Sequence, residues 1–122
     1  MSNTQAQRIA ALFGLLAVAL GAFGAHSLKH LLAENQTATI WEKAVFYHFI
    51  HAVMLFILAE RRPFQICPWF SFLVGILLFS GSLYVLALTN NRWLGAVTPF
   101  GGVGFIVGWT CLLLKPLYGP KA

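Results

Sequence analysis

The sequence "AVFYHFIHAVMLF", at residues 44–56, is a long apolar run that contains two histidines three positions apart. Polar and apolar residues do not alternate in it, so the run predicts a helix and not a strand. Other apolar runs of similar length occur along the chain. Each approaches the ~20 apolar residues that a helix needs to cross the hydrocarbon core of a bilayer. The sequence therefore predicts transmembrane helices at about residues 9–28, 41–60, 69–88 and 94–115.

The overall composition also indicates a membrane protein. Of the 122 residues, 59% are hydrophobic and only 9% are charged, whereas soluble domains carry about 25% charged residues. The net charge of +5 comes from scattered basic residues that form no stripe, so we expect no nucleic-acid partner. We expect a single transmembrane domain over residues 1–122, folded as an all-α, antiparallel up-down bundle of four helices with both termini on one side.

The lysines and arginines near the ends of the apolar runs predict the orientation. More of them lie on the side of the termini than on the other side. They are Arg8, Arg61, Arg62, Lys115 and Lys121 on the side of the termini, and Lys29, Lys43 and Arg92 on the other. This imbalance predicts a multi-pass protein of the inner (plasma) membrane with both termini in the cytoplasm.

Small residues recur at helical spacing in each run, as close helix packing in lipid requires. The predicted packing residues are Gly14, Ala17, Gly21 and Gly24; Ala44, Ala52 and Ala59; Ser71, Gly75 and Ser82; and Gly101, Gly104 and Gly108. In the last run, Thr98 followed by Pro99 predicts an N-cap and the first helical residue.

Tryptophans and cysteines support two further predictions. Trp41, Trp69, Trp93 and Trp109 lie near the predicted helix ends, as interfacial anchors do, although Trp109 is deep enough to pack internally. Cys67 and Cys111 are far apart in the sequence and lack a redox motif, so we expect free thiols.

Polar residues concentrate in the half of the membrane opposite the termini. At about 100° per residue, His48 shares a face with Ala44 and Ala52, and His51 lies about 60° away. We expect these histidines to belong to one polar cluster that forms a candidate ligand-binding site. Its members are His26, Glu42, Tyr47, His48, His51, Ser80, Ser82, Tyr84 and Thr98.

Several functions are compatible with this cluster. The histidines can simply link helices through hydrogen bonds. The cluster can instead bind a lipid headgroup, a quinone or a partner membrane protein. His26, His48 and His51 also offer ligands for a metal or a haem, and a histidine can move protons. We predict a non-enzymatic protein of the lipid bilayer that binds a ligand or a partner membrane protein, with no cofactor. The partner can also be a second copy of the chain, in a homo-oligomer. The alternative is a metal or haem site, or a proton or ion pathway.

Four motifs resemble those of a known family. They are "GAFGAH" at 21–26, "YHFIHAVML" at 47–55, "FSGSLYVLALT" at 79–89 and "TPFGGVGFIVGW" at 98–109. Together they resemble the small membrane family called domain of unknown function 423, or transmembrane protein 256. The resemblance covers all four predicted helices and implies a multi-helix integral membrane protein, with no catalytic or ligand residues to carry over. It disfavours a cleaved signal peptide, which Arg8, Ala22 and Ala25 would otherwise permit for the first run.

Overall fold

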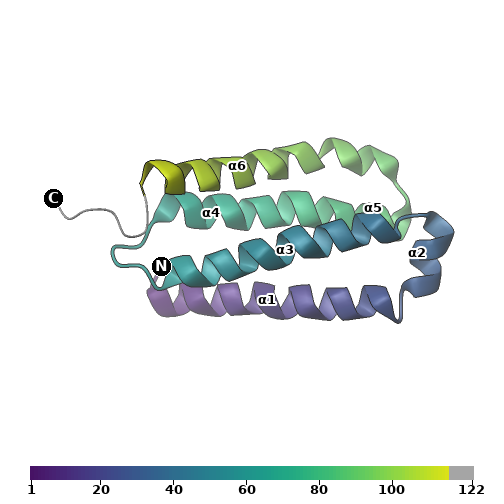
Figure 1. Ribbon diagram of the computed structural model, residues 1–122, viewed down its shortest axis with the longest axis horizontal. Coiled ribbons are helices and arrows are strands. Elements are labelled where there is room, and N and C mark those ends of the chain that lie inside the picture. The colour runs from purple at the N-terminus through teal and green to yellow at the C-terminus, as the bar shows by residue number, and fades with distance from the viewer. Residues whose placement is uncertain (116–122) are drawn as a thin grey trace.

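The computed structural model of the chain describes residues 1–115 and is almost entirely helical (Figure 1). In chain order its elements are α1 (Asn3–Ala25), α2 (Lys29–Asn35), α3 (Ala38–Ala59), α4 (Ile66–Gly75), η1 (Ile76–Ser80), α5 (Gly81–Thr89), η2 (Arg92–Ala96) and α6 (Thr98–Leu114). The elements α4, η1 and α5 form one continuous span in which η1 is π-helical. The 3-10 helix η2 joins this span to α6.

Four spans in residues 1–115 are long and apolar enough to cross a membrane. They are Asn3–Ala25, Ala38–Ala59, Ile66–Thr89 and Arg92–Leu114. Consecutive spans run in opposite directions, and the start of α1 lies at the same end of the molecule as the end of α6 (Figure 1). The prediction of an all-α protein with four up-and-down membrane helices is confirmed.

Some helix ends differ from the predicted ones. Helix α1 already begins at Asn3, because the Ser2 hydroxyl accepts a hydrogen bond from the Gln5 backbone amide at 3.1 Å and the Gln5 side-chain oxygen accepts one from the Ser2 backbone amide at 2.9 Å. Helix α6 begins at Thr98, but its N-cap is Val97 and not Thr98. The Thr98 hydroxyl is engaged with Ser82 instead, so it caps nothing.

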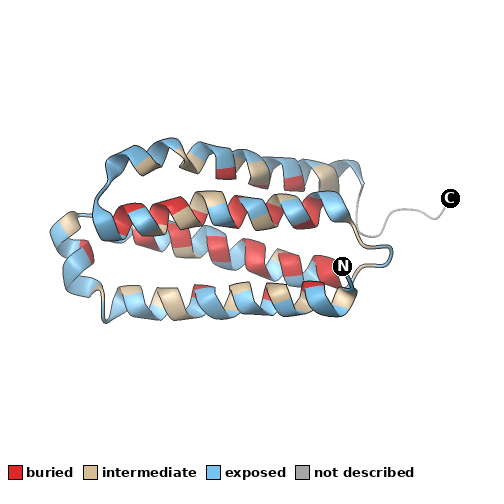
Figure 2. Ribbon diagram, turned by 180° about the vertical axis from the view of Figure 1, so that it is seen from behind, coloured by how far each residue is buried: buried red, intermediate tan, exposed pale blue. Residues whose placement is uncertain are grey.

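The spans lie side by side in the order α1, α3, α4–α5 and α6 (Figure 1). In the most apolar stretch of the inner spans, 39% (α3) and 44% (α4 to α5) of the residues are buried. The corresponding fractions are 11% for α1 and 17% for the span that contains α6. Figure 2 shows the same concentration of buried residues on the inner helices. The inner spans therefore supply most of the core, and α1 and α6 are outer helices.

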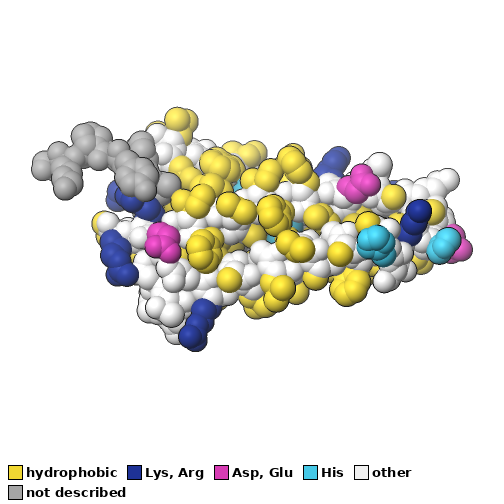
Figure 3. All heavy atoms as spheres, turned by 60° about the horizontal axis from the view of Figure 1, so that its bottom comes forward, with side chains coloured by type: hydrophobic (Ala, Val, Ile, Leu, Met, Phe, Trp, Pro, Cys, Tyr) yellow, Lys and Arg dark blue, Asp and Glu magenta, His cyan; other side chains and the backbone are white. Residues whose placement is uncertain are grey.

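The outer helices leave large apolar side chains uncovered. Leu15 and Val18 of α1 and Ile106 and Leu113 of α6 are all exposed. Figure 3 shows apolar side chains spread along the middle of one face, with charged side chains towards its ends. This distribution fits a bilayer, whose hydrocarbon core is bordered by polar headgroups.

Glycines allow α6 to lie close to its neighbour. A Cβ atom at Gly101 would overlap the backbone of Phe79 in η1, and one at Gly108 would overlap the ring of Phe72 in α4. Gly104 of α6, which lies between these two glycines in the sequence, packs against the backbone of Gly75 in α4. Because lipid supplies no hydrophobic driving force between helices, such close van der Waals contact is a main source of association.

The small residues predicted in the first two runs have different outcomes. Ala17 is fully buried, and a Cβ at Gly24 would overlap the Trp41 indole. Gly21 faces Val45, whereas nothing lies within 4 Å of a Cβ at Gly14, so Gly14 makes no close packing contact among the described residues. On α3, the predicted set Ala44, Ala52 and Ala59 is buried throughout.

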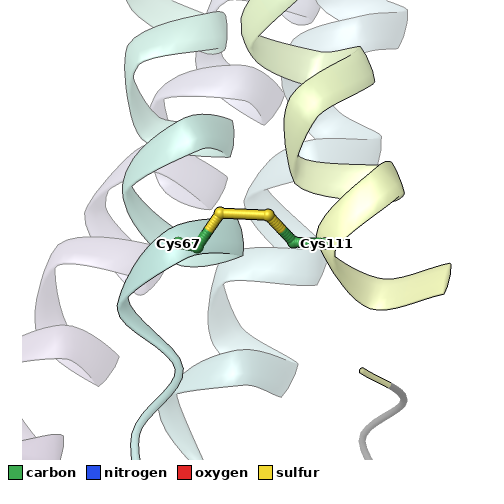
Figure 4. Close-up of a disulfide and its surroundings, with 2 residues drawn as sticks. All are labelled: Cys67 and Cys111. Carbon is green, nitrogen blue, oxygen red and sulfur yellow. A yellow bond between two sulfur atoms is a disulfide. The ribbon is translucent and has the colours of Figure 1, made fainter. Parts of the chain in front are cut away.

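The prediction of free thiols is wrong. Cys67 near the start of α4 and Cys111 near the end of α6 form a disulfide, with their Cα atoms 6.6 Å apart (Figure 4). They are separated by 44 positions in the sequence. The antiparallel pairing of α4 and α6 brings the two cysteines together. Their separation in the sequence does not reveal which helices pack side by side.

Two of the tryptophans predicted as interfacial anchors are in fact interior residues. Trp41 and Trp69 are buried, and their indole N–H groups donate to the carbonyls of Leu20 and Leu55. Trp93, in contrast, is exposed in η2, as an interfacial residue should be. All of these tryptophans were predicted as anchors because they lie near helix ends. The face of the helix on which each one lies decides whether it points to lipid.

We expect Gly101→Val to destabilise the protein by about 1–3 kcal/mol or more, because the new side chain forces α6 away from η1. Gly81→Val is the matched control, since no atom of the described residues lies within 4 Å of a Cβ there. Thermal unfolding of the two variants in the same detergent checks this expectation. Equal melting temperatures would show that the close α6–η1 approach contributes nothing to stability.

Candidate functional site

His48 is buried in α3 and links this helix to α5. Its Nδ1 atom lies 2.8 Å from the Tyr84 hydroxyl, a hydrogen bond whose donor depends on the imidazole tautomer. The Tyr84 ring in turn packs edge-on against Trp41, with ring centroids 4.8 Å apart. The other ring nitrogen, Nε2, is buried and has no hydrogen-bond partner among residues 1–115. Phe13 of α1 lies close by, edge-on to the imidazole at 6.0 Å.

His51 links α3 to α6 and uses both of its ring nitrogens. The Trp109 indole donates to Nε2 at 3.0 Å, and an indole N–H can only donate. The proton must therefore sit on Nδ1, which donates to the Tyr47 carbonyl at 2.7 Å. The imidazole also stacks on Phe105 at 3.7 Å between ring centroids. Held in this way, His51 is a neutral interhelical link.

The hydroxyl residues of the predicted cluster form two further links between helices. The Ser80 hydroxyl donates to the Ala44 carbonyl at 2.7 Å and joins η1 to α3. The Ser82 hydroxyl lies 2.6 Å from that of Thr98 and joins α5 to α6. Both serines are buried, so each contact satisfies a polar group that water cannot reach.

The predicted single cluster is divided in the structure. His48 and His51 are three residues apart, which rotates them about 60° on the helix. His48 consequently faces Phe13 and Tyr84, and His51 faces Phe105 and Trp109. His26 and Glu42 are exposed, and among residues 1–115 they form no hydrogen bond or ion pair with His48 or His51. No group of three His, Cys, Asp or Glu side chains that could hold a metal occurs in residues 1–115, so His26, His48 and His51 do not converge.

A groove of about 330 Å³ opens between α3 and α6, and we call it the aromatic groove. It is lined by Tyr47 and His51 of α3, Phe79 of η1, and Gly102, Phe105, Ile106 and Trp109 of α6. The Tyr47 ring contacts Phe79 at 4.7 Å and stacks parallel to Phe105 at 6.1 Å between centroids. Among residues 1–115, no charged side chain lines the groove.

The residues that line the aromatic groove on α6 were not predicted as site residues. Phe105 and Trp109 are four positions apart and therefore share one face of the helix, with Gly102 one turn earlier. This i, i+4 aromatic pair after a glycine is a signal that sequence reasoning could have used. What it lacked was the knowledge that this face meets α3.

We expect the His48–Tyr84 hydrogen bond to contribute about 0.6–2 kcal/mol to stability, as interhelical bonds in membranes do. A double-mutant cycle of His48→Leu and Tyr84→Phe, followed by unfolding in detergent, isolates this coupling energy. The pair Ser82→Ala and Tyr84→Phe, which share no hydrogen bond, is the control and should be additive. Additive effects of the His48 and Tyr84 substitutions would mean that the hydrogen bond is energetically silent.

Comparison with known proteins places the chain among membrane proteins. A family described as "Protein of unknown function (DUF423)" matches residues 20–102. A "UPF0382 membrane protein" of Staphylococcus epidermidis is 44% identical over 113 residues, which cover 89% of this chain and 92% of the relative. "UPF0382 membrane protein YwdK" of Bacillus subtilis is 42% identical over 113 residues, covering 87% and 90%. "UPF0382 inner membrane protein YgdD" of Escherichia coli is 39% identical over 110 residues, covering 86% and 83%. No solved structure matches significantly.

Proposed function

Because the chain belongs to the DUF423 family of membrane proteins, its function must be sought in a site that works within lipid, and we propose that this site is the aromatic groove. In this proposal the protein is a non-enzymatic binding component that holds a flat, uncharged, carbonyl-bearing ligand of the quinone class. The observation that carries the proposal is the Tyr47 hydroxyl, a polar group at bilayer depth without a protein partner.

The depth of Tyr47 can be estimated from helix geometry. At about 1.5 Å per residue, Tyr47 lies ~14 Å from the start of α3 at Ala38 and ~18 Å from its end at Ala59. The hydrocarbon core of a bilayer is about 30 Å thick, so Tyr47 lies near its centre. Water and the ester groups of lipids are scarce at this depth.

The Tyr47 hydroxyl takes part in none of the hydrogen bonds among residues 1–115. In hydrocarbon, a polar group without a partner costs several kcal/mol, on the order of a lost hydrogen bond. Tyr47 is exposed and lines the aromatic groove, so a bound molecule with a carbonyl oxygen can accept a hydrogen bond from its hydroxyl. A quinone offers such an oxygen and is apolar enough to enter the middle of the bilayer.

The walls of the aromatic groove suit a flat ring. Phe79 and Phe105 offer ring surfaces beside Tyr47, and aromatic pairs favour offset or edge-to-face contacts. The His51 imidazole and the Trp109 indole are held in place by their mutual hydrogen bond, so this wall is ordered before a ligand arrives. The volume of about 330 Å³ lies within the usual range for small-molecule sites.

The internal hydrogen bonds favour a role of the histidines as links between helices over ligation of a metal or haem. His51 uses both nitrogens in bonds to the protein, so ligation by His51 would have to break an interhelical link. Among residues 1–115, the Nε2 atom of His48 has no hydrogen-bond partner, but it belongs to no group of three metal-binding side chains. A proton or ion pathway finds no support in the described contacts, because His48 and His51 belong to separate sets. We therefore propose neither.

Binding can be tested with decylubiquinone, a short-tailed quinone, added to the protein in lipid nanodiscs. We expect saturable quenching of tryptophan fluorescence, because Trp109 lines the groove. Tyr47→Phe should weaken the affinity about fivefold, as expected for the loss of one hydrogen bond. Gly102→Leu should abolish saturable binding, because a Cβ there meets only Phe79 at 3.9 Å and a larger side chain extends into the groove.

The matched control is Gly81→Leu, which places the same side chain where nothing lies within 4 Å of the Cβ. It should bind decylubiquinone as the unaltered protein does. The proposal fails if the unaltered protein shows only non-saturable quenching, as a quinone dissolved in lipid would cause. It also fails if Gly102→Leu binds as tightly as Gly81→Leu.

We also propose that the protein lies in the inner membrane with both termini in the cytoplasm. Among the described residues, Arg8, Arg61, Arg62 and Lys115 support this orientation under the positive-inside rule, and Lys121 lies outside them. The Cys67–Cys111 disulfide lies at the same end and is a feature typical of oxidising compartments, so it favours the opposite orientation. A labelling experiment distinguishes the two.

Single cysteines placed in a Cys67→Ser, Cys111→Ser background report the orientation in intact cells. Asn91→Cys, just before η2, and Ser2→Cys, just before α1, are both at exposed positions. A membrane-impermeant maleimide should label Asn91→Cys from outside and Ser2→Cys only after the membrane is opened. The reverse pattern would place the termini outside and give the disulfide side an oxidising environment.

A further inference from the structure

A second groove lies where the end of α1, helix α2 and the start of α3 meet, and we call it the interfacial groove. Its volume is about 340 Å³, and its lining includes Gly24 and Ala25 of α1, Leu32 of α2, and Trp41, Glu42 and Phe46 of α3. We propose that the interfacial groove binds a phospholipid whose headgroup carries a primary ammonium, as that of phosphatidylethanolamine does. This inference uses none of the residues that line the aromatic groove.

The depth of the interfacial groove matches that of a lipid headgroup. Glu42 lies four residues after Ala38, the start of α3, which is about 6 Å along the helix. Leu32 and Phe46 continue the lining with apolar surface, against which the upper part of an acyl chain can pack. The groove thus has a charged group and an apolar wall, as the two parts of a phospholipid require.

Glu42 supplies the charge that selects the ligand. It is the one charged residue in the lining, it is exposed, and it makes no ion pair or hydrogen bond with residues 1–115. A carboxylate accepts charge-assisted hydrogen bonds, which are stronger than neutral ones. An ammonium group is its natural partner, and a primary ammonium can donate hydrogen bonds whereas a trimethylated one cannot.

The end of helix α1 adds a second source of negative potential. The carbonyls of Gly24 and Ala25 accept no hydrogen bond from residues 1–115, because the following amides bond to Phe23 and His26 instead. A helix carries about half a negative charge at its carboxyl end. No basic side chain occupies the last turn of α1 to offset it. Both carbonyls belong to residues of the groove, so they reinforce the preference of Glu42 for a cation.

Trp41 forms a wall of the interfacial groove that its neighbours hold in place. Its indole packs against Gly24 and donates a hydrogen bond to the Leu20 carbonyl at 2.9 Å. The ring is also in contact with Tyr84, so it is held from α1 and from α5. A preformed wall of this kind lowers the entropic cost of ordering side chains when a ligand binds.

Basic groups near the interfacial groove suit the phosphate of the same lipid. Lys29 and His30 at the start of α2 are exposed and follow the three-residue turn after the end of α1. Figure 3 shows acidic, basic and histidine side chains gathered at one end of this face, beside the apolar surface. A zwitterionic headgroup can therefore meet charges of both signs at this end.

The experiment compares lipids that differ only in the headgroup. Native mass spectrometry of the detergent-solubilised protein measures binding of phosphatidylethanolamine and phosphatidylcholine with identical chains. We expect the ethanolamine lipid to bind about five- to tenfold more tightly, the effect of roughly one charge-assisted hydrogen bond. Glu42→Gln should reduce this ratio to nearly one, and adding methyl groups to the ammonium one at a time should reduce it stepwise.

Glu34→Gln is the matched control, because Glu34 is an exposed acid at the same end but does not line the groove. It should keep the preference of the unaltered protein, and all variants should unfold at similar temperatures. Equal binding of the two lipids by the unaltered protein would show only nonspecific annular lipid and would overturn the proposal. A preference that survives Glu42→Gln would overturn it as well.

Discussion

The scarcity of water in the middle of a bilayer is the constraint on which this structure depends. Each polar group there must find a partner in the protein or in a ligand. His48, His51, Ser80 and Ser82 all do so with groups on neighbouring helices, and they thereby tie α3, the central span and α6 together. Two polar atoms at this depth have no such partner among the described residues: the His48 Nε2 atom, which is buried, and the Tyr47 hydroxyl, whose side chain lines the groove between α3 and α6.

Close packing complements these hydrogen bonds and explains the open row of helices. Glycines on α6 allow contact with η1 and α4, and Gly24 accommodates Trp41 between α1 and α3. Each outer helix packs mainly against one inner neighbour, so its remaining faces stay apolar and exposed. The aromatic groove and the interfacial groove both lie where an outer helix meets α3, at different depths. An open row therefore offers lipid-accessible hollows that a closed bundle would fill.

Sequence reasoning was most successful for properties that repeat along the chain. Apolar length identified the four spans, and the spacing of Ala44, Ala52 and Ala59 identified the buried face of α3. The start of α6 was placed within one residue by Thr98 and Pro99. It was less successful for the site, since His26 and Glu42 are exposed and apart from His48. Common depth in the membrane does not imply contact, because residues at one depth can point to different neighbours.

The sequence by itself thus determined that this chain is a membrane protein with four helical spans, because hydrophobic length and helical period are local properties. Only the tertiary structure decided which helix faces which. That arrangement sends His48 towards Tyr84 and His51 towards Trp109, joins Cys67 to Cys111, and places Trp41 against Gly24. The physical reason is that these contacts connect residues far apart in the chain, and their distance depends on helix order and rotation, which no local pattern encodes.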